Sequence, residues 1–368
     1  MRAVPFIRPL DAYDELQPDI DAAIRGVLHG GQYVLGHAVE SFEHNWAAFC
    51  GAAHAVGVSD GLAALTLALR ALAIEPGDEV LVPSNTFIAT WLAVSACGGV
   101  PVPVEPDPRT GLVTAEGIEA RITSRTRVVV PVHLYGMPAD LGAIGRTAAH
   151  HGLHVIEDAA QAHGARYQDV RIGGHSSIVC WSFYPTKNLG AIGDGGAITT
   201  RDAALAERLR LLRNYGSAEK YVHPVKGVNS RLDPIQAAIL DAKLPHLAEW
   251  NERRAALAAR YCAQLGDLPL ALPRVGAGDT SSWHLFVVRS PQRDALRQHL
   301  AAAGIECLVH YPIPPHLQGA YAELGLGLGD LPVAEAIAVE SLSLPIGPHL
   351  SEDDVDYVCD SICQFHLQ

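Results

Sequence analysis

The segment "RVVVPVHLYGMPADLGAIGRTAAHHGLHVIEDAA" (127–160) decides the fold of this chain of 368 residues. It opens with a Val-rich run typical of a buried strand, continues with a helical pattern at about 140–151, and returns to an apolar run that ends in Asp158. Two parallel strands need a crossover connection of this kind, because a hairpin cannot join them. The segment therefore predicts one strand–helix–strand unit of a parallel sheet.

The same alternation of apolar runs and helical patterns precedes this segment. It is seen in "AVGV" (55–58) before "GLAALTLALRAL" (61–72), in "EVLVP" (79–83) before "TFIATWLAVSAC" (86–97), and in "VPVPVE" (100–105) before a helix near 114–122. These repeats predict an α/β protein whose mostly parallel central sheet is flanked by helices on both faces. Ligands of such sheets bind beyond the carboxyl ends of the strands.

Helical and mixed patterns surround this block. We expect entry helices at roughly 12–28 and 37–50, and a long helical stretch over 231–265 that Pro245 kinks or splits. A strand, a helix and a second strand follow at 283–290, 293–304 and 305–312. The sequence thus predicts a large domain over 1–240 and a smaller C-terminal α+β domain over 241–368, joined by the long helix.

Composition and charge exclude several classes of protein. The formal net charge of −13 disfavours a nucleic-acid binder, which needs a basic face. No apolar run is long enough to span a bilayer, and the opening residues lack the apolar core of a secretory signal. The seven cysteines are odd in number and scattered, which suits neither a disulfide framework nor a metal site. We expect a cytoplasmic protein without metal, membrane or nucleic-acid partners.

Unusual polar residues gather at the predicted strand ends. In "SFYPTKNLGAIGDGG" (182–196), Lys187 lies between a strand-like run and a glycine-rich turn. Asp158 and Gln161 follow one strand, the turn Ser59-Asp60-Gly61 opens a helix, and Phe87 follows another strand. Each has a structural alternative: a surface lysine, helix caps at Asp158 and at Ser59 or Asp60, and core packing for Phe87.

Together these residues supply what pyridoxal 5'-phosphate requires. The cofactor needs an amine for its aldehyde, a carboxylate for its ring nitrogen, donors for its phosphate and a flat partner for its ring. A helix start provides backbone N–H groups for the phosphate. The glycines after Lys187 allow the backbone to pass close to a bulky group.

Four segments resemble the signatures of the nucleotide-sugar aminotransferases of the DegT/StrS family. They are "SFYPTKNLGAIGDGG", "IEDAAQAHGA", "VPVHLYGMPADL" and "GVNSRLDPIQAAIL", and the resemblance extends from about residue 30 to 350. It implies a fold-type I enzyme that uses pyridoxal phosphate, cycles through pyridoxamine phosphate and works as a homodimer with shared active sites.

The resemblance also implies roles for single residues. Lys187 would form the Schiff base and carry the proton, and Asp158 would pair with the pyridine nitrogen. The implied cofactor-binding set is completed by Gln161 at the ring hydroxyl, Phe87 on the ring, Ser182, Asp60 and Gly61 at the phosphate, and Asn229 from the second subunit. The turn here reads Ser-Asp-Gly where many relatives have Ser-Gly-Thr, so we expect backbone donors rather than the Asp60 side chain to bind phosphate.

Two longer segments, "PSNTFIATWLAVSACGGVPVPVEPD" (83–107) and "NYGSAEKYVHPVKGVNSRLDP" (214–234), are similar to one branch of the family. That branch aminates the 3-keto group of thymidine-diphosphate 6-deoxyhexoses, which implies a nucleotide-diphosphate ketosugar as substrate and L-glutamate as amino donor. The residues that would contact the sugar or its diphosphate are Tyr184, Lys220, Tyr221, His223, Arg231, His310 and Tyr311.

Several alternatives stay open at this point. A 4-keto sugar or a cyclitol ketone would use the same chemistry and fold. A non-catalytic sensor that keeps the fold is disfavoured by the intact Lys187, Asp158 and Gln161. A related dehydratase branch carries histidine in place of the lysine, so Lys187 disfavours it as well.

Overall fold

The computed structural model describes residues 2–367 and centres on a seven-stranded sheet in the order β1-β9-β8-β5-β4-β2-β3. From β8 to β3 all neighbours are parallel, whereas β9 runs antiparallel to both β8 and β1. The predicted mostly parallel sheet is confirmed. Its strands are β1 (His54–Val58), β2 (Glu79–Pro83), β3 (Val100–Val104), β4 (Thr126–Val129), β5 (His154–Asp158), β8 (Ile178–Ser182) and β9 (Gly196–Thr200).

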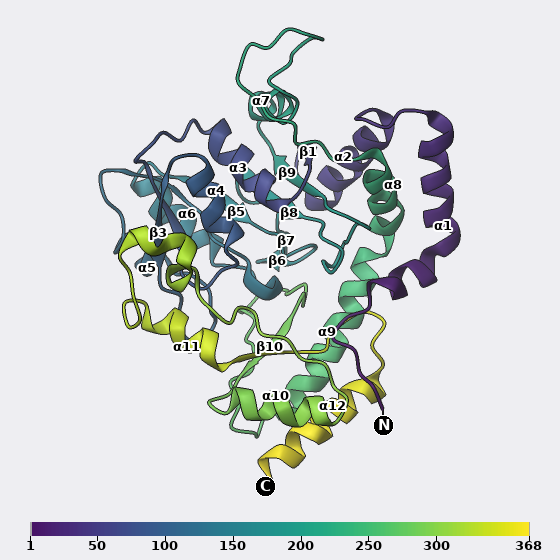
Figure 1. Cartoon of the computed structure of the whole chain (residues 1–368), viewed down its shortest axis with the longest axis vertical. Helices are drawn as coiled ribbons and strands as arrows, with labels where there is room; N and C mark the ends of the chain where they lie inside the picture. The colour runs from purple at the N-terminus through teal and green to yellow at the C-terminus, as the bar shows by residue number, and fades with distance from the viewer. Residues whose placement is uncertain (1, 368) are drawn as a thin grey trace.

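Helices cover both faces of this sheet (Figure 1). Alternate residues of β8 point to opposite layers, Ile178 and Cys180 to one core and Val179 and Trp181 to the other. The first layer holds α3 (Gly61–Ala71), α4 (Ala89–Ala96) and α7 (Ala203–Arg213). The second holds α2 (His37–Cys50), α5 (Ala115–Glu119), α6 (Leu141–His150) and α8 (Pro234–Lys243). Burial on both faces explains why these strands lack polar alternation.

The long helical stretch splits where Pro245 predicted a break. After α8, the 3-10 turn η2 (Leu244–His246) contains the proline, and α9 (Leu247–Leu265) follows. The entry helices are confirmed as α1 (Pro9–Gly30) and α2. Short elements complete the first part of the chain: η1 (Leu134–Gly136) and a two-stranded ribbon of β6 (Arg166–Tyr167) and β7 (Val170–Arg171).

A second core lies in the C-terminal part of the chain. Strands β10 (Phe286–Arg289) and β11 (Ser341–Leu344) pair antiparallel. Around them lie α10 (Arg293–Ala302), η3 (Pro315–Leu317), η4 (Gly319–Leu324), α11 (Pro332–Glu340) and α12 (Glu352–His366). The sheet core extends to Leu247, whereas the second core takes its α9 residues from Leu257 onward and also includes Val4. We therefore propose that the domain division runs through α9, and that the residues before α1 belong to the C-terminal domain.

The strand predicted over 305–312 is wrong. This segment makes only isolated bridges, Ile305 with Val4 and Leu308 with Ser343. Its backbone thus turns from the N-terminal segment to β11 within a few residues, and Pro312 has no N–H for a ladder. The chain here divides its pairing between two partners and forms no ladder with either.

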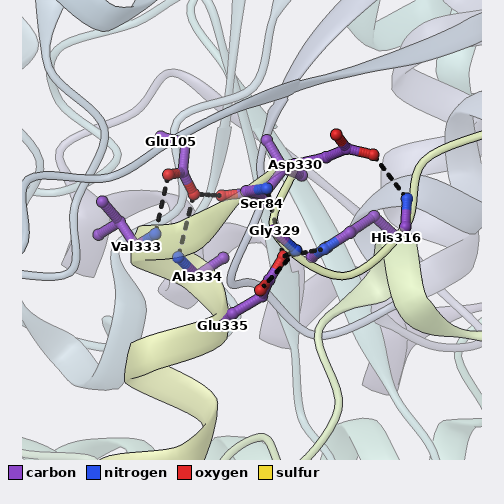
Figure 2. Close-up of polar contacts among 10 residues, drawn as sticks. Ser84, Glu105, His316, Gly329, Asp330, Val333, Ala334 and Glu335 are labelled. Atoms are coloured by element: carbon purple, nitrogen blue, oxygen red, sulfur yellow. Dashed lines mark hydrogen bonds and ion pairs between the residues drawn. The ribbon is translucent and has the colours of Figure 1, made fainter.

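Glu105 ties the C-terminal part to the end of β3. Figure 2 shows its carboxylate at the start of α11, where Oε2 accepts from the N–H of Val333 at 2.9 Å and Oε1 from that of Ala334 at 3.0 Å. The hydroxyl of Ser84 donates to Oε1 at 3.3 Å. Because the N-cap residue Leu331 has no capping side chain, Glu105 satisfies the orphan donors of this helix from a distant part of the chain.

Replacing Glu105 with alanine should destabilise the protein by about 1–2 kcal/mol, because two N–H groups of α11 lose their acceptor. Urea unfolding followed by circular dichroism measures this loss. Glu323→Ala, on the exposed side of η4, is the matched control and should leave the midpoint unchanged. Equal midpoints for the two variants would contradict the capping role.

No helix within residues 2–367 combines the length and the apolar character needed to cross a membrane.

Candidate active site

Asp158 is the buried polar group at the carboxyl end of β5. Its Oδ2 accepts from the hydroxyl of Thr90 on α4 at 2.9 Å, and its Oδ1 accepts from the N–H of Ala160 at 3.2 Å. Burial raises the pKa of Asp158, while these two hydrogen bonds and the charge of Lys187 act in the opposite direction. The carboxylate is thus held in one orientation, with one hydrogen bond on each oxygen.

Lys187 lies in the turn after β8, the strand that neighbours β5. Its backbone N–H donates to the carbonyl of Tyr184 at 2.8 Å, which fixes the turn. Burial lowers the pKa of Lys187 to about 8, against the charge of Asp158, which raises it. A lysine held this way exposes far more neutral amine near neutral pH than a surface lysine does, and the neutral amine is the nucleophile. The surface-lysine alternative is therefore disfavoured.

The turn before α3 presents free backbone donors. Asp60 acts as N-cap, with Oδ1 accepting from the N–H of Ala63 at 2.8 Å and Oδ2 from the hydroxyl of Ser59 at 2.8 Å. Among the described residues, nothing accepts from the N–H of Gly61 or Leu62. Two unpaired N–H groups at a helix start form an anion site.

Gly61 also brings this turn against Ser182 on β8. A Cβ added at Gly61 would lie 2.7 Å from Cβ of Ser182, so only glycine permits this approach. The predicted phosphate residues Asp60, Gly61 and Ser182 therefore lie together. The Asp60 side chain serves the helix as its cap, which agrees with the expectation that backbone groups are the donors.

Gln161 joins the carboxyl end of β5 to the C-terminal part of the chain. Its Nε2 donates to the hydroxyl of Tyr311 at 3.0 Å, and its Oε1 accepts from the N–H of Tyr135 at 2.5 Å. The ring of Phe87 lies 5.2 Å from that of Tyr311, with centroids as end points. Phe87 is 52% exposed, so the core-packing alternative for this residue is wrong.

His310 lies next to this group and is uncharged at neutral pH. Its Nδ1 and the hydroxyl of Ser343 are 2.7 Å apart, and its carbonyl accepts from the hydroxyl of Tyr135. Burial, together with the charge of Lys187, lowers the pKa of His310 to about 4. The structure thus places His310 and Tyr311 next to Gln161, and their contact with a sugar stays a prediction.

Asn229 and Arg231 line a cavity of about 420 Å³ that also includes Ser59 and Asp194. The guanidinium of Arg231 donates from Nη1 to the side-chain oxygen of Asn214 at 3.0 Å. Two predicted residues thus line one cavity with Ser59, and Arg231 keeps further donors for a ligand.

Three predicted sugar-site residues do not join the group around Lys187. Lys220, Tyr221 and His223 lie on the loop over 215–228, which projects from the body beyond α7 (Figure 1). Tyr221 is 82% exposed, and the ammonium of Lys220 lies 5.3 Å from the centroid of the Tyr221 ring. Tyr184 is also largely exposed, next to the turn of Lys187.

Sequence reasoning missed Thr90. Its hydroxyl lies 3.1 Å from that of Thr86 and bonds to Asp158, so a short chain of hydroxyls supports the carboxylate. The only signal in the sequence was the spacing of four between Thr86 and Thr90, which places both on one side of a helical turn. No group of three or more metal-binding side chains comes together in residues 2–367.

In the cofactor-free protein, the reactivity of Lys187 toward acetic anhydride should rise with pH, because only the neutral amine reacts. Burial predicts a midpoint at about 8 for Lys187, compared with about 10.4 for a free lysine side chain. Competitive labelling followed by mass spectrometry measures this midpoint. Asp158→Asn should move it lower, since the carboxylate stabilises the ammonium. A midpoint above 10 would contradict this description.

Comparison with known proteins identifies aminotransferases as similar to this chain. The family model "DegT/DnrJ/EryC1/StrS aminotransferase family" matches residues 14–363. The chain is 56% identical to dTDP-3-amino-3,4,6-trideoxy-alpha-D-glucose transaminase of Streptomyces venezuelae over 361 residues, which is 98% of this chain and 95% of that protein. The crystal structure of S. venezuelae DesV in complex with a ketimine intermediate superposes with a TM-score of 0.99 at 54% identity, covering 100% of both chains.

Another similar structure is that of NtdA from Bacillus subtilis with bound cofactor PMP. It has a TM-score of 0.93 and 31% identity, and the match covers 100% of this chain and 86% of NtdA. With the family model spanning nearly all of the chain and relatives far above 30% identity, the resemblance seen in the sequence is confirmed. The chain belongs to the DegT/DnrJ/EryC1/StrS aminotransferase family.

Proposed function

We propose that this protein is a pyridoxal-phosphate-dependent aminotransferase that converts the 3-keto group of a dTDP-linked 3-keto-6-deoxyhexose into an amine, with L-glutamate as donor. One observation carries the proposal: the carboxylate of Asp158 and the amine of Lys187 lie at neighbouring strand ends, close enough to affect each other's pKa. The names of two relatives support the choice of substrate: one is a 3-amino trideoxyhexose transaminase, at 56% identity, and the other is a 3-amino dideoxyhexose transaminase, at 48%.

The residues present fit the cofactor. When bound, pyridoxal phosphate supplies an aldehyde and an electron-withdrawing ring. The N–H groups of Gly61 and Leu62, with Ser182, would hold the phosphate, and Asp158 would keep the pyridine nitrogen protonated. Phe87 would pack on the ring, and Gln161 would bind its hydroxyl.

Lys187 carries the proton transfers. Its Nζ would hold the cofactor aldehyde, and as a free amine it would take a proton from the carbon of the amino donor and later give one to the sugar carbon. A pKa lowered to about 8 suits this exchange, because general acid–base catalysis works best near the operating pH. The uncharged His310 does not compete for the proton.

We further propose a homodimer in which the loop over 215–228 reaches the active site of the second subunit. The loop projects from its own body and carries exposed Lys220, Tyr221 and His223, which would give the sugar diphosphate positive and aromatic partners. Asn229 would follow it to the partner's cofactor phosphate. The cysteines in residues 2–367 are all unpaired, which suits the reducing cytoplasm.

Other acceptors would use the same residues. A 4-keto sugar or a cyclitol ketone differs from the proposed substrate only in what surrounds the carbonyl, so a set of ketone acceptors distinguishes them. A non-catalytic sensor is a function of another class, and it predicts cofactor binding without turnover.

The direct test is an absorption spectrum of the purified protein with pyridoxal phosphate. L-glutamate should convert the band of the lysine-bound cofactor into that of the pyridoxamine form, and the dTDP-3-keto sugar should restore the first band. Lys187→Ala should show neither change, and Asp158→Asn should bind cofactor but turn over at least about a hundredfold more slowly. Conversion by glutamate without restoration by any ketosugar would refute the substrate, and cofactor binding without either change would favour the sensor.

Thr90→Val should reduce kcat by about tenfold, because Asp158 loses a hydrogen bond that favours its charged form. Thr90→Ser keeps the hydroxyl and should behave like the wild type. A second readout is the spectrum of the bound cofactor as a function of pH, whose titration should shift in the valine variant alone. Identical spectra and rates for both variants would show that Thr90 has no positioning role.

A further inference from the structure

Two buried cations lie apart from the residues assigned above. Lys243 at the end of α8 is 5% exposed, and Arg254 on α9 is 3% exposed. Both line a cavity of about 210 Å³ between the segment before α1, the turn of Lys187 and the loop at 347–350. Burying a cation costs several kcal/mol unless an anion accompanies it, so this pair requires an explanation.

Neither cation has a carboxylate partner among residues 2–367. The two carboxylates that line the cavity are used elsewhere. Asp354 Oδ1 lies 2.5 Å from Nη2 of Arg2, and the Asp354 side chain also completes the capping box of α12. Asp11 Oδ1 lies 3.3 Å from Nε of Arg8. The protein therefore leaves a positive cavity that its own acids do not neutralise.

Both cations keep unused donors. The ammonium of Lys243 donates to the carbonyl of Gly190 at 2.8 Å and has two further protons. Arg254 donates from Nη1 to the carbonyls of Trp283 and Ile346, each at 3.2 Å. Its Nε is buried and without any partner in the part of the chain described, and its Nη2 makes no hydrogen bond there either.

The unused donors of Arg254 indicate what would bind. Within residues 2–367, Nη2 keeps both of its protons free, and a guanidinium donor of this kind binds a carboxylate through charge-assisted hydrogen bonds. The cavity volume of about 210 Å³ gives room for a small molecule. Trp250 and Phe6 add apolar walls.

We propose that this cavity binds a small carboxylate anion, paired with Nη2 of Arg254 and neutralised in addition by Lys243. Because Lys243 also holds Gly190 in the turn of Lys187, the bound anion lies directly behind that turn. An anion that binds the folded chain and not the unfolded chain would raise the free energy of unfolding. The proposal is independent of which ketone the protein aminates.

The test is calorimetric titration of the holoenzyme with succinate, which has neither an amino nor a keto group and so cannot enter transamination. Sodium chloride at equal ionic strength corrects for screening. We expect saturable binding of one succinate per chain, weakened about tenfold or more in Arg254→Met and in Lys243→Met. Arg253→Met is the matched control, because Arg253 is the next residue on α9 and pairs with Glu15 and Glu249 instead. Its affinity should equal that of the wild type.

Absence of saturable binding, or equal affinity in all variants, would overturn the proposal. A crystal structure grown with succinate gives a second measurement that does not depend on the folding of the variants. Density for a carboxylate at Nη2 of Arg254 supports the site. Succinate bound only elsewhere, or an acidic side chain of a second copy of the chain in the cavity, would overturn it.

Discussion

The electrostatic interaction between Asp158 and Lys187 is the constraint on which the rest of the structure depends. Each group is held where water is scarce, so burial alone would drive both toward their neutral forms. Each also stabilises the charge of the other: Lys187 acts to lower the pKa of Asp158, and Asp158 acts to raise the pKa of Lys187, which burial brings down to about 8. The hydroxyl of Thr90 and the N–H of Ala160 favour the charged carboxylate still further. A carboxylate and an amine whose pKa is close to neutral pH can therefore lie together at the carboxyl ends of β5 and β8.

The fold brings these groups together through the order of its strands. Because β5 and β8 are parallel neighbours, their carboxyl ends place Asp158 and the turn of Lys187 side by side. The antiparallel β9 takes the chain straight back from that turn, and Gly196 at its start lies against Asp60, where a Cβ would come within 2.3 Å of the carbonyl oxygen. The anion site of α3 is thus fixed to the same strands. The C-terminal domain closes the group with Tyr311, and the contact of Glu105 with α11 holds that domain to the sheet.

Much of this could be predicted from the sequence, since it depends on local patterns. Continuous Val and Ile runs identified β2, β4 and β5, and Pro245 identified the break before α9. The antiparallel direction of β9 and the divided pairing of 305–312 depend on partners far away in the chain, which no local pattern reveals. The same holds for Thr90 and Arg254, whose importance lies in what surrounds their polar atoms. In the sequence, Thr90 and Arg254 look like ordinary positions of two helical patterns, and nothing there distinguishes them from their neighbours.

On this description, Lys187, Asp158 and the start of α3 together would hold the cofactor. A crystal structure of the protein grown with pyridoxal phosphate tests it most directly. The account predicts continuous density from Nζ of Lys187 to the cofactor, the pyridine nitrogen within hydrogen-bond distance of Asp158, and the phosphate on the N–H groups of Gly61 and Leu62. A cofactor bound without a link to Lys187, or with its phosphate away from α3, would contradict the account.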